Sequence, residues 1–238
     1  MEYNYTTTVS RSAPTVQADF YRRTFGLVGL SCAAFGAVLA LILSSPLAET
    51  ITKLIYGTGW IGILLVIAGF WAASAFANRL AFGGASKSSQ LAGLGIYIVI
   101  EAIIFTPLLS LCFALFGVQE GLSTIVVPAA ASTFLLAGGL ILTAFLTKKD
   151  FSFLRSFVVI GTFVALAAIV VMAITGTAMT SWMIIAMIGL MAITILYQAW
   201  VVRTQLNSDQ YVGAALIIFA GIATLFYYVI LLFLQRRD

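Results

Sequence analysis

Histidine is absent from this 238-residue sequence, and other ionisable side chains are scarce. Only 8% of the residues are charged, against roughly 25% in an average soluble domain. Without an imidazole the chain cannot form a Ser-His-Asp triad, a histidine-ligated haem or the usual zinc sites. The sequence also offers no nucleophile beside a base. We therefore predict a protein that is not an enzyme and that holds no cofactor or metal.

Cysteine is almost as rare, and the two present do not form a recognisable pattern. Cys32 and Cys112 both lie inside long apolar stretches. A buried thiol in such surroundings behaves as a small hydrophobic side chain. The sequence therefore predicts neither a disulfide framework nor a cysteine-based metal site.

Hydrophobic residues dominate what remains, at 62% of the chain. A membrane-spanning helix needs about 20 consecutive apolar residues, and seven stretches meet this requirement. We predict an all-α membrane protein, a bundle of seven transmembrane helices forming one transmembrane domain over residues 1–238, with the lipid bilayer as its partner and residues 1–23 as an N-terminal tail. The predicted spans are residues 25–43, 60–78, 91–116, 122–146, 153–175, 181–202 and 213–234.

The twelve basic residues are distributed unevenly between the connections. Nine fall on the side of the N-terminus and three on the other side, Lys53, Arg236 and Arg237. The nine are Arg11, Arg22, Arg23, Arg79, Lys87, Lys148, Lys149, Arg155 and Arg203. Loops rich in Lys and Arg stay in the cytoplasm, so we predict a cytoplasmic N-terminus and a C-terminus outside. The net charge of +4 is then explained by orientation rather than by nucleic-acid binding.

Glu101 is the only acidic residue deep inside a predicted span. A charged side chain at the centre of a bilayer costs at least ~2.5 kcal/mol, and intramembrane ionisable groups are functional by default. No basic residue lies at similar depth, whereas Tyr97, one helical turn earlier, can hydrogen-bond to it. Two interpretations follow: Glu101 is a proton or cation site, or it is a neutral, hydrogen-bonded acid that holds helices together.

Other polar or helix-bending positions within the spans are weaker signals. Pro107 and Pro128 free backbone carbonyl groups and bend helices. Gln198, beside Tyr197 near the end of the sixth span, can hydrogen-bond across helices. Each of these features has an ordinary structural explanation.

Several segments, in order along the chain, resemble the Bax inhibitor-1 family. Residues 20–27 (FYRRTFGL) are similar to the family's entry into its first helix. Residues 147–154 (TKKDFSFL) resemble a family signature. Residues 211–216 (YVGAAL), followed by 225–226 (LF) and 236–238 (RRD), resemble its last helix and tail. The resemblance covers nearly the whole chain and implies a seven-helix membrane protein with the last helix central.

The resemblance also implies a set of functions and a site. Family members are associated with a pH-dependent calcium leak, with suppression of cell death in eukaryotes, and in bacteria with a membrane-bound protease as partner. The family commonly has a pH-sensing pair of aspartates, one after a tyrosine in the sixth span and one in the seventh. Here the matching positions are Gln198, after Tyr197, and Gly221. Neither can titrate, and Glu101 is the only deep carboxyl group left to replace them.

Two functions therefore compete for a protein expected in a bacterial cell inner membrane. In the first it is a calcium or cation leak channel, with Glu101 as the titratable group and calcium or protons as cargo. In the second it does not conduct, and it regulates a partner such as a membrane-bound protease. The missing aspartates strengthen the case for the second, and the leak channel stays the first hypothesis.

Overall fold

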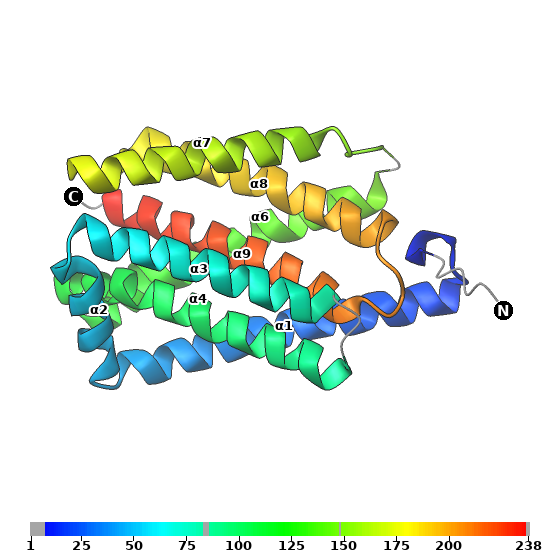
Figure 1. The fold of residues 1–238 in the computed structure, drawn as a ribbon, viewed down its shortest axis with the longest axis horizontal. Helices are drawn as coiled ribbons and strands as arrows, with labels where there is room; N and C mark the ends of the chain where they lie inside the picture. Colours follow the sequence, from blue (N-terminus) through cyan, green and yellow to red (C-terminus); the bar gives the residue numbers. More distant parts are fainter. Residues whose placement is uncertain (1–7, 83–85, 148, 237–238) are drawn as a thin grey trace.

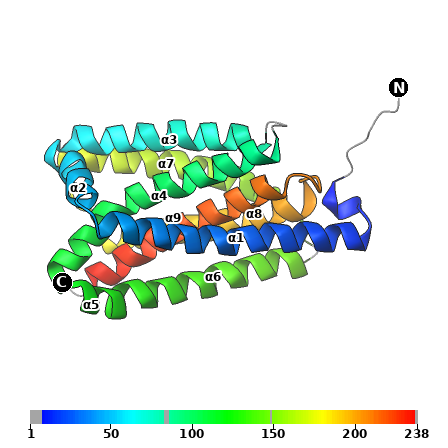
Figure 2. The same ribbon diagram turned by 90° about the horizontal axis from the view of Figure 1, so that it is seen from below.

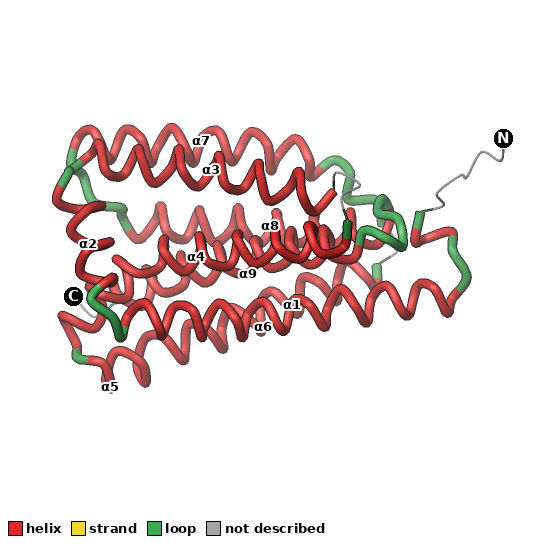
Figure 3. Tube along the Cα trace, turned by 60° about the horizontal axis from the view of Figure 1, so that its bottom comes forward, coloured by secondary structure: helices red, strands yellow, loops and turns green. Residues whose placement is uncertain are grey.

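The computed structural model describes residues 8–82, 86–147 and 149–236, and within them the chain is almost entirely helical (Figure 3). The elements in chain order are η1 (Val9–Arg11), α1 (Pro14–Leu43), α2 (Leu47–Gly57), α3 (Trp60–Phe82), α4 (Lys87–Phe116), α5 (Val118–Gly121), η2 (Leu122–Val126), α6 (Val127–Leu146), α7 (Leu154–Thr175), α8 (Ser181–Thr204) and α9 (Tyr211–Gln235). Lys148, Arg237 and Asp238, which contribute to the orientation or family arguments above, lie outside the described residues.

Seven helices among the described residues are long and apolar enough to cross a membrane. They are α1, α3, α4, the continuous stretch from α5 to α6, α7, α8 and α9. The prediction of an all-helical chain with seven long apolar helices is confirmed. Where each helix enters the membrane, and which end faces the cytoplasm, stay predictions.

The last helix lies at the centre of the bundle (Figures 1 and 2). It packs against α1, α3, α4, α6 and α8. In its most apolar 18-residue window 56% of the residues are buried, whereas none are buried in that of α7. The difference predicts that α7 is solvated mainly by lipid, while α9 is shielded by other helices, as the family resemblance implies.

Helices α1 and α4 begin earlier than the apolar pattern predicts. α1 starts at Pro14, within the predicted tail, and carries proline in its first turn, where the missing N–H would have had no helical partner. α4 starts at Lys87, after Ser86, whose hydroxyl accepts from the Ser89 N–H at 3.3 Å. Polar first turns hide these starts from a search for apolar runs.

A short amphipathic helix, α2, connects α1 to α3, where the sequence analysis assigns only a connection. It lies at the end of the bundle opposite the N-terminus (Figure 1). Glu49 and Lys53 form a 2.6 Å ion pair on its exposed face. Its approach to α3 requires glycine at position 62, because a Cβ there would lie 2.3 Å from the Ile55 carbonyl oxygen.

A π-helical turn, η2, joins α5 to α6 immediately before Pro128. The proline ring would clash with the carbonyl group four residues earlier in a regular α-helix. In the π turn the Val127 N–H bonds instead to the Leu122 carbonyl oxygen. The turn thus lets one long helix accommodate an internal proline.

The end of the bundle that carries the N-terminal segment is closed by polar contacts. The Val9 N–H donates to the Leu206 carbonyl oxygen at 2.8 Å, and the Val9 side chain is fully buried. The Lys87 ammonium donates to the Asp209 carbonyl oxygen and lies over the Tyr211 ring, 4.8 Å from its centroid. These contacts tie α4 and the segment before α1 to the α8–α9 connection.

Candidate functional site: a cavity around Glu101

Glu101 lies on α4 and is almost completely buried, with 3% of its surface exposed. Tyr97, one helical turn earlier, is a side-chain hydrogen-bond partner of its carboxyl group, as the spacing predicts. The other carboxyl oxygen, Oε1, has no hydrogen-bond partner among the described residues. A buried acceptor without a partner is costly unless water or an ion serves it.

Glu101 lines a cavity of about 520 Å³. The cavity is lined by side chains of α3, α4, α7, α8 and α9, with Ile55 and Tyr56 of α2 at one end. Gln198 and Gly221, the two family aspartate positions, line the same cavity. The structure therefore brings together three of the five predicted site residues, from three different helices.

The other two predicted site residues do not line this cavity. Tyr97 is 4% exposed and contacts the site through the Glu101 carboxyl group. Its ring forms a T-shaped pair with that of Phe219, which does not line this cavity, with 6.2 Å between centroids. Tyr197 stacks on Trp200 with ring centroids 5.9 Å apart. The Tyr197 ring therefore serves packing along α8 rather than the cavity.

Gln198 and Gly221 are in direct steric contact across the α8–α9 interface. A Cβ added at Gly221 would lie 2.5 Å from Gln198 Oε1 and 3.0 Å from Ile195 Cγ1. The absence of a side chain at 221 makes room for the amide of Gln198. The Gln198 Oε1 atom is buried and has no hydrogen-bond partner within the described part of the chain. The site therefore contains a second buried oxygen, besides Glu101 Oε1, that accepts no hydrogen bond from these residues.

Three threonines add neutral oxygens to the cavity wall and were missed in the sequence analysis. Thr162, Thr194 and Thr224 line the cavity. Each hydroxyl donates to the carbonyl group four residues earlier, at 2.7 to 2.8 Å. Because the proton is used within the helix, the lone pairs remain available to water or a cation. Threonine is common in apolar helices, so only the packing distinguishes these three.

The site contains one carboxyl group and otherwise neutral oxygens. Among the residues the structure describes, no group of three or more His, Cys, Asp or Glu side chains could hold a metal ion. A firmly bound Ca²⁺ takes six to eight oxygen ligands, several of them carboxylate. This donor set is suited to transient rather than tight cation binding.

The fold and the site together define a multi-pass integral membrane protein with a buried acid in a cavity between its helices. The family described as Inhibitor of apoptosis-promoting Bax1 matches residues 17–238. The chain belongs to the Bax inhibitor-1 family. A search of curated proteins gives no significant match.

Proposed function

We propose that this protein is a pH-sensitive cation leak in which Glu101 is the titratable group. The observation that carries the proposal is that Glu101 lines the same cavity as Gln198 and Gly221, the positions where family resemblance places a pair of aspartates. In this chain the carboxyl group lies on α4 rather than on α8 and α9, and it borders the same cavity.

The cost of burying Glu101 supports a functional role. A packing role would be served at lower cost by a neutral residue of similar shape. Moreover, only one of its oxygens is engaged by Tyr97, and Oε1 is left without a partner among the described residues. A cation or water in the cavity would complete its coordination.

The direction of the pH effect follows from the charge of this group. Protonated Glu101 is neutral and offers little attraction to a cation, whereas the ionised carboxylate attracts one strongly in a low-dielectric site. Flux should therefore increase as pH rises through the range in which Glu101 ionises. A single carboxylate holds Ca²⁺ weakly, and weak binding allows an ion to leave as well as enter.

Conduction would require a rearrangement at the N-terminal end of the cavity. Beyond Gln198 on α8, Ala199 and Val202 are fully buried, and Leu216 on α9 is 1% exposed. These side chains separate the cavity from the end closed by Lys87 and Tyr211. We place the gate in this packed layer.

The test is Ca²⁺ efflux from liposomes that contain the purified full-length protein, at several pH values. Glu101→Gln keeps the shape of the side chain and removes its charge, so it should abolish the pH-dependent part of the flux. Glu120→Gln, at the exposed start of the fourth apolar stretch, removes one acidic group far from the cavity and should leave flux unchanged. Equal flux in wild type and Glu101→Gln would contradict the proposal.

A second function, regulation of a membrane-bound partner without conduction, is favoured by the Gln198–Gly221 contact. These two positions fit each other sterically and carry no charge, so they could serve packing alone. This alternative predicts no flux above that of empty liposomes from a folded protein. It also predicts that a membrane protein, such as a membrane-bound protease, co-purifies in stoichiometric amount after cross-linking in native membranes.

A further inference from the structure

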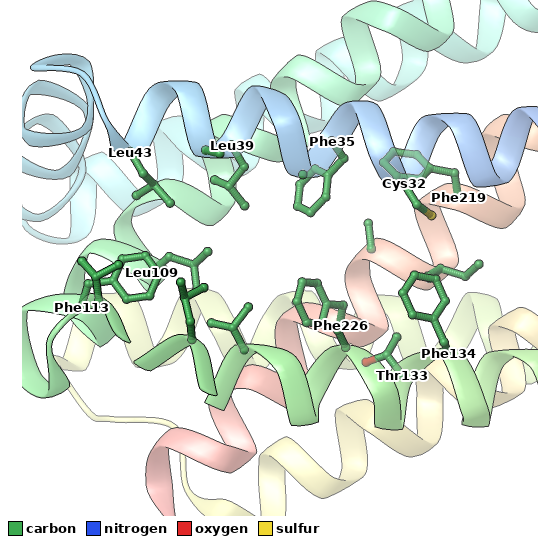
Figure 4. Close-up of a pocket in the computed structure, with 18 of the residues that line it drawn as sticks. Cys32, Phe35, Leu39, Leu43, Leu109, Phe113, Thr133, Phe134, Phe219 and Phe226 are labelled. Atoms are coloured by element: carbon green, nitrogen blue, oxygen red, sulfur yellow. The ribbon is translucent and has the colours of Figure 1, made fainter. Parts of the chain in front are cut away.

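A second cavity lies between α1 and α6 and shares no lining residue with the cavity around Glu101. Its volume is about 540 Å³. Figure 4 shows Phe35, Leu39 and Leu43 of α1 on one wall, Phe134 of α6 on the opposite wall, and Phe226 of α9 between them. We refer to this cavity as the α1–α6 groove.

The lining of the groove is suited to an apolar ligand. Its hydroxyl groups are already engaged within their own helices: Thr133 donates to the Ala129 carbonyl oxygen at 2.8 Å, and Ser44 to that of Leu41 at 3.1 Å. No ionisable carboxylate or ammonium group of the described residues lines it. A ligand with polar atoms would therefore find no charged partner along the groove.

The groove opens to the surface that faces lipid. α1 and α6 meet near the start of α1, where the Tyr21 and Phe145 ring centroids lie 5.1 Å apart. Toward α2 the two helices diverge (Figure 2), and each packs on α9 instead. At the mouth, Val118, Leu122 and Phe134 are 60%, 41% and 53% exposed. In a membrane the mouth is thus continuous with the hydrocarbon of the bilayer.

The length of the groove corresponds to one leaflet. On α1 its lining extends from Cys32 to Ser44, a helical rise of about 18 Å at 1.5 Å per residue. The hydrocarbon layer of one leaflet is about 15 Å deep, half of a ~30 Å core. Ser44 lies at the end of α1 next to α2, so the groove belongs to the leaflet on the α2 side.

The size of the groove excludes a helix as its occupant. A helix is about 10 Å across and rises about 5.4 Å per turn, so a space of 540 Å³ holds little more than one turn. It does fall within the range of roughly 300–1,000 Å³ that is typical of small, largely apolar ligands. Left empty, it would forfeit the dispersion contacts of its walls.

We propose that the α1–α6 groove binds a single lipid acyl chain from the leaflet on the α2 side. The chain enters laterally between α1 and α6, with its headgroup near Ser44 and its end near Cys32 and Thr133. This inference is independent of the cation leak, because it uses a different cavity and no titratable group.

The first test is native mass spectrometry of the full-length protein after delipidation and addition of a defined phosphatidylcholine. Wild type should retain one lipid. Gly36 lines the groove, and no neighbouring atom lies within 4 Å of the position that a Cβ would take there, so Gly36→Trp can place an indole ring in the space. It should weaken retention by more than about tenfold, since each methylene group excluded from apolar contact costs several-fold in affinity.

The matched control is Gly29→Trp, on the same face of α1 two turns earlier. Gly29 also has no neighbouring atom within 4 Å, and it lies outside the groove. This variant should retain the lipid as wild type does. Equal retention by the two variants, or no lipid retained by wild type, would overturn the proposal.

A second measurement on the wild type covers the case in which Gly36→Trp fails to fold. A phosphatidylcholine with a diazirine on its acyl chain, added at one equivalent, should cross-link to Phe35, Leu39 or Phe134 on illumination. Cross-links confined to outer residues such as Leu135, which is 79% exposed, would overturn the proposal.

Discussion

The amide oxygen of Gln198 on α8 occupies the space that a side chain at Gly221 on α9 would need, 2.5 Å from the Cβ position. The two residues are therefore in steric contact at the wall of the Glu101 cavity. The size of the side chain at either position limits the size of the side chain that fits at the other.

Gly221→Ala should reveal this coupling as a loss of stability. The added methyl group forces Gln198 and Ile195 aside, and overpacking of this kind costs about 1–3 kcal/mol, partly offset by the higher helix propensity of alanine. Gln198→Ala should relieve the clash, so the double variant should be more stable than the sum of the single changes predicts. Unfolding midpoints in detergent measure this cycle.

The control for that cycle is Gly139→Ala on α6. No atom lies within 4 Å of a Cβ at this position, so the change should be neutral or stabilising. If Gly221→Ala behaves like Gly139→Ala, the Gln198 side chain moves without cost and the proposed coupling is absent.

Arg203 on α8 should contribute to stability through the C-terminal end of α6. Its Nη1 donates to the carbonyl oxygens of Phe145 and Thr147, at 3.2 and 2.6 Å, which lack partners further along the helix. Arg203→Ala should lower the free energy of unfolding by about 1.5–3 kcal/mol, the range for hydrogen bonds from a charged donor. Arg155→Ala, which removes an exposed charge at the start of α7, should change it little. Similar losses in both variants would contradict a specific capping role.

The orientation of the bundle is predicted from its basic residues and can be measured by cysteine labelling. In a background with Cys32→Ala and Cys112→Ala, Ala178→Cys places an exposed thiol between α7 and α8, and Ser208→Cys places one between α8 and α9. A membrane-impermeant maleimide should label only the first in intact cells, and both after permeabilisation. Labelling of Ser208→Cys alone in intact cells would reverse the orientation.

The seven apolar helices are predictable from sequence because the thickness of the bilayer sets the length of an apolar run. The burial of Glu101 and its contact with Tyr97 follow from the same helical spacing. α2 was missed because its eleven residues are too short to span a membrane, although its alternation of apolar and charged positions has helical period.

The cavity itself could not be predicted, because it depends on how helices distant in sequence pack. Nothing in the chain order places Glu101 of α4 in the same cavity as Gln198 of α8 and Gly221 of α9. The family resemblance indicates that positions 198 and 221 belong to one site. That Glu101 lines the same site is known only from the tertiary structure. The same packing gives Thr194 and Thr224 a place on the cavity wall, whereas the stacking of Tyr197 on Trp200 is local to α8.

The pH dependence of flux should have a definite sign. Ionisation of Glu101 creates the charge that attracts a cation, so Ca²⁺ efflux in wild-type liposomes should rise with pH and then level off. Glu101→Gln should give a flat profile, because glutamine does not titrate. A profile in wild type that falls as pH rises would indicate that the neutral acid is the conducting form and would contradict the proposed role.

Restoring the aspartate pair separates the two proposed functions. Gln198→Asp together with Gly221→Asp removes the long amide that blocks position 221 and places two carboxyl groups on the wall of the cavity that Glu101 also lines. Positions 198 and 221 are in contact, and carboxyl groups at such a short separation share protons and titrate as a coupled pair. Two carboxylates also attract divalent cations more strongly than one does. If wild type conducts through Glu101, the double variant should conduct more Ca²⁺, with an altered pH profile. If wild type shows no flux and the double variant conducts, the fold can form a cation pathway only when the two aspartates are present. The regulatory function is then the better description of this chain. A folded double variant without flux would show that the cavity does not lead across the membrane, and it would contradict the leak in either form.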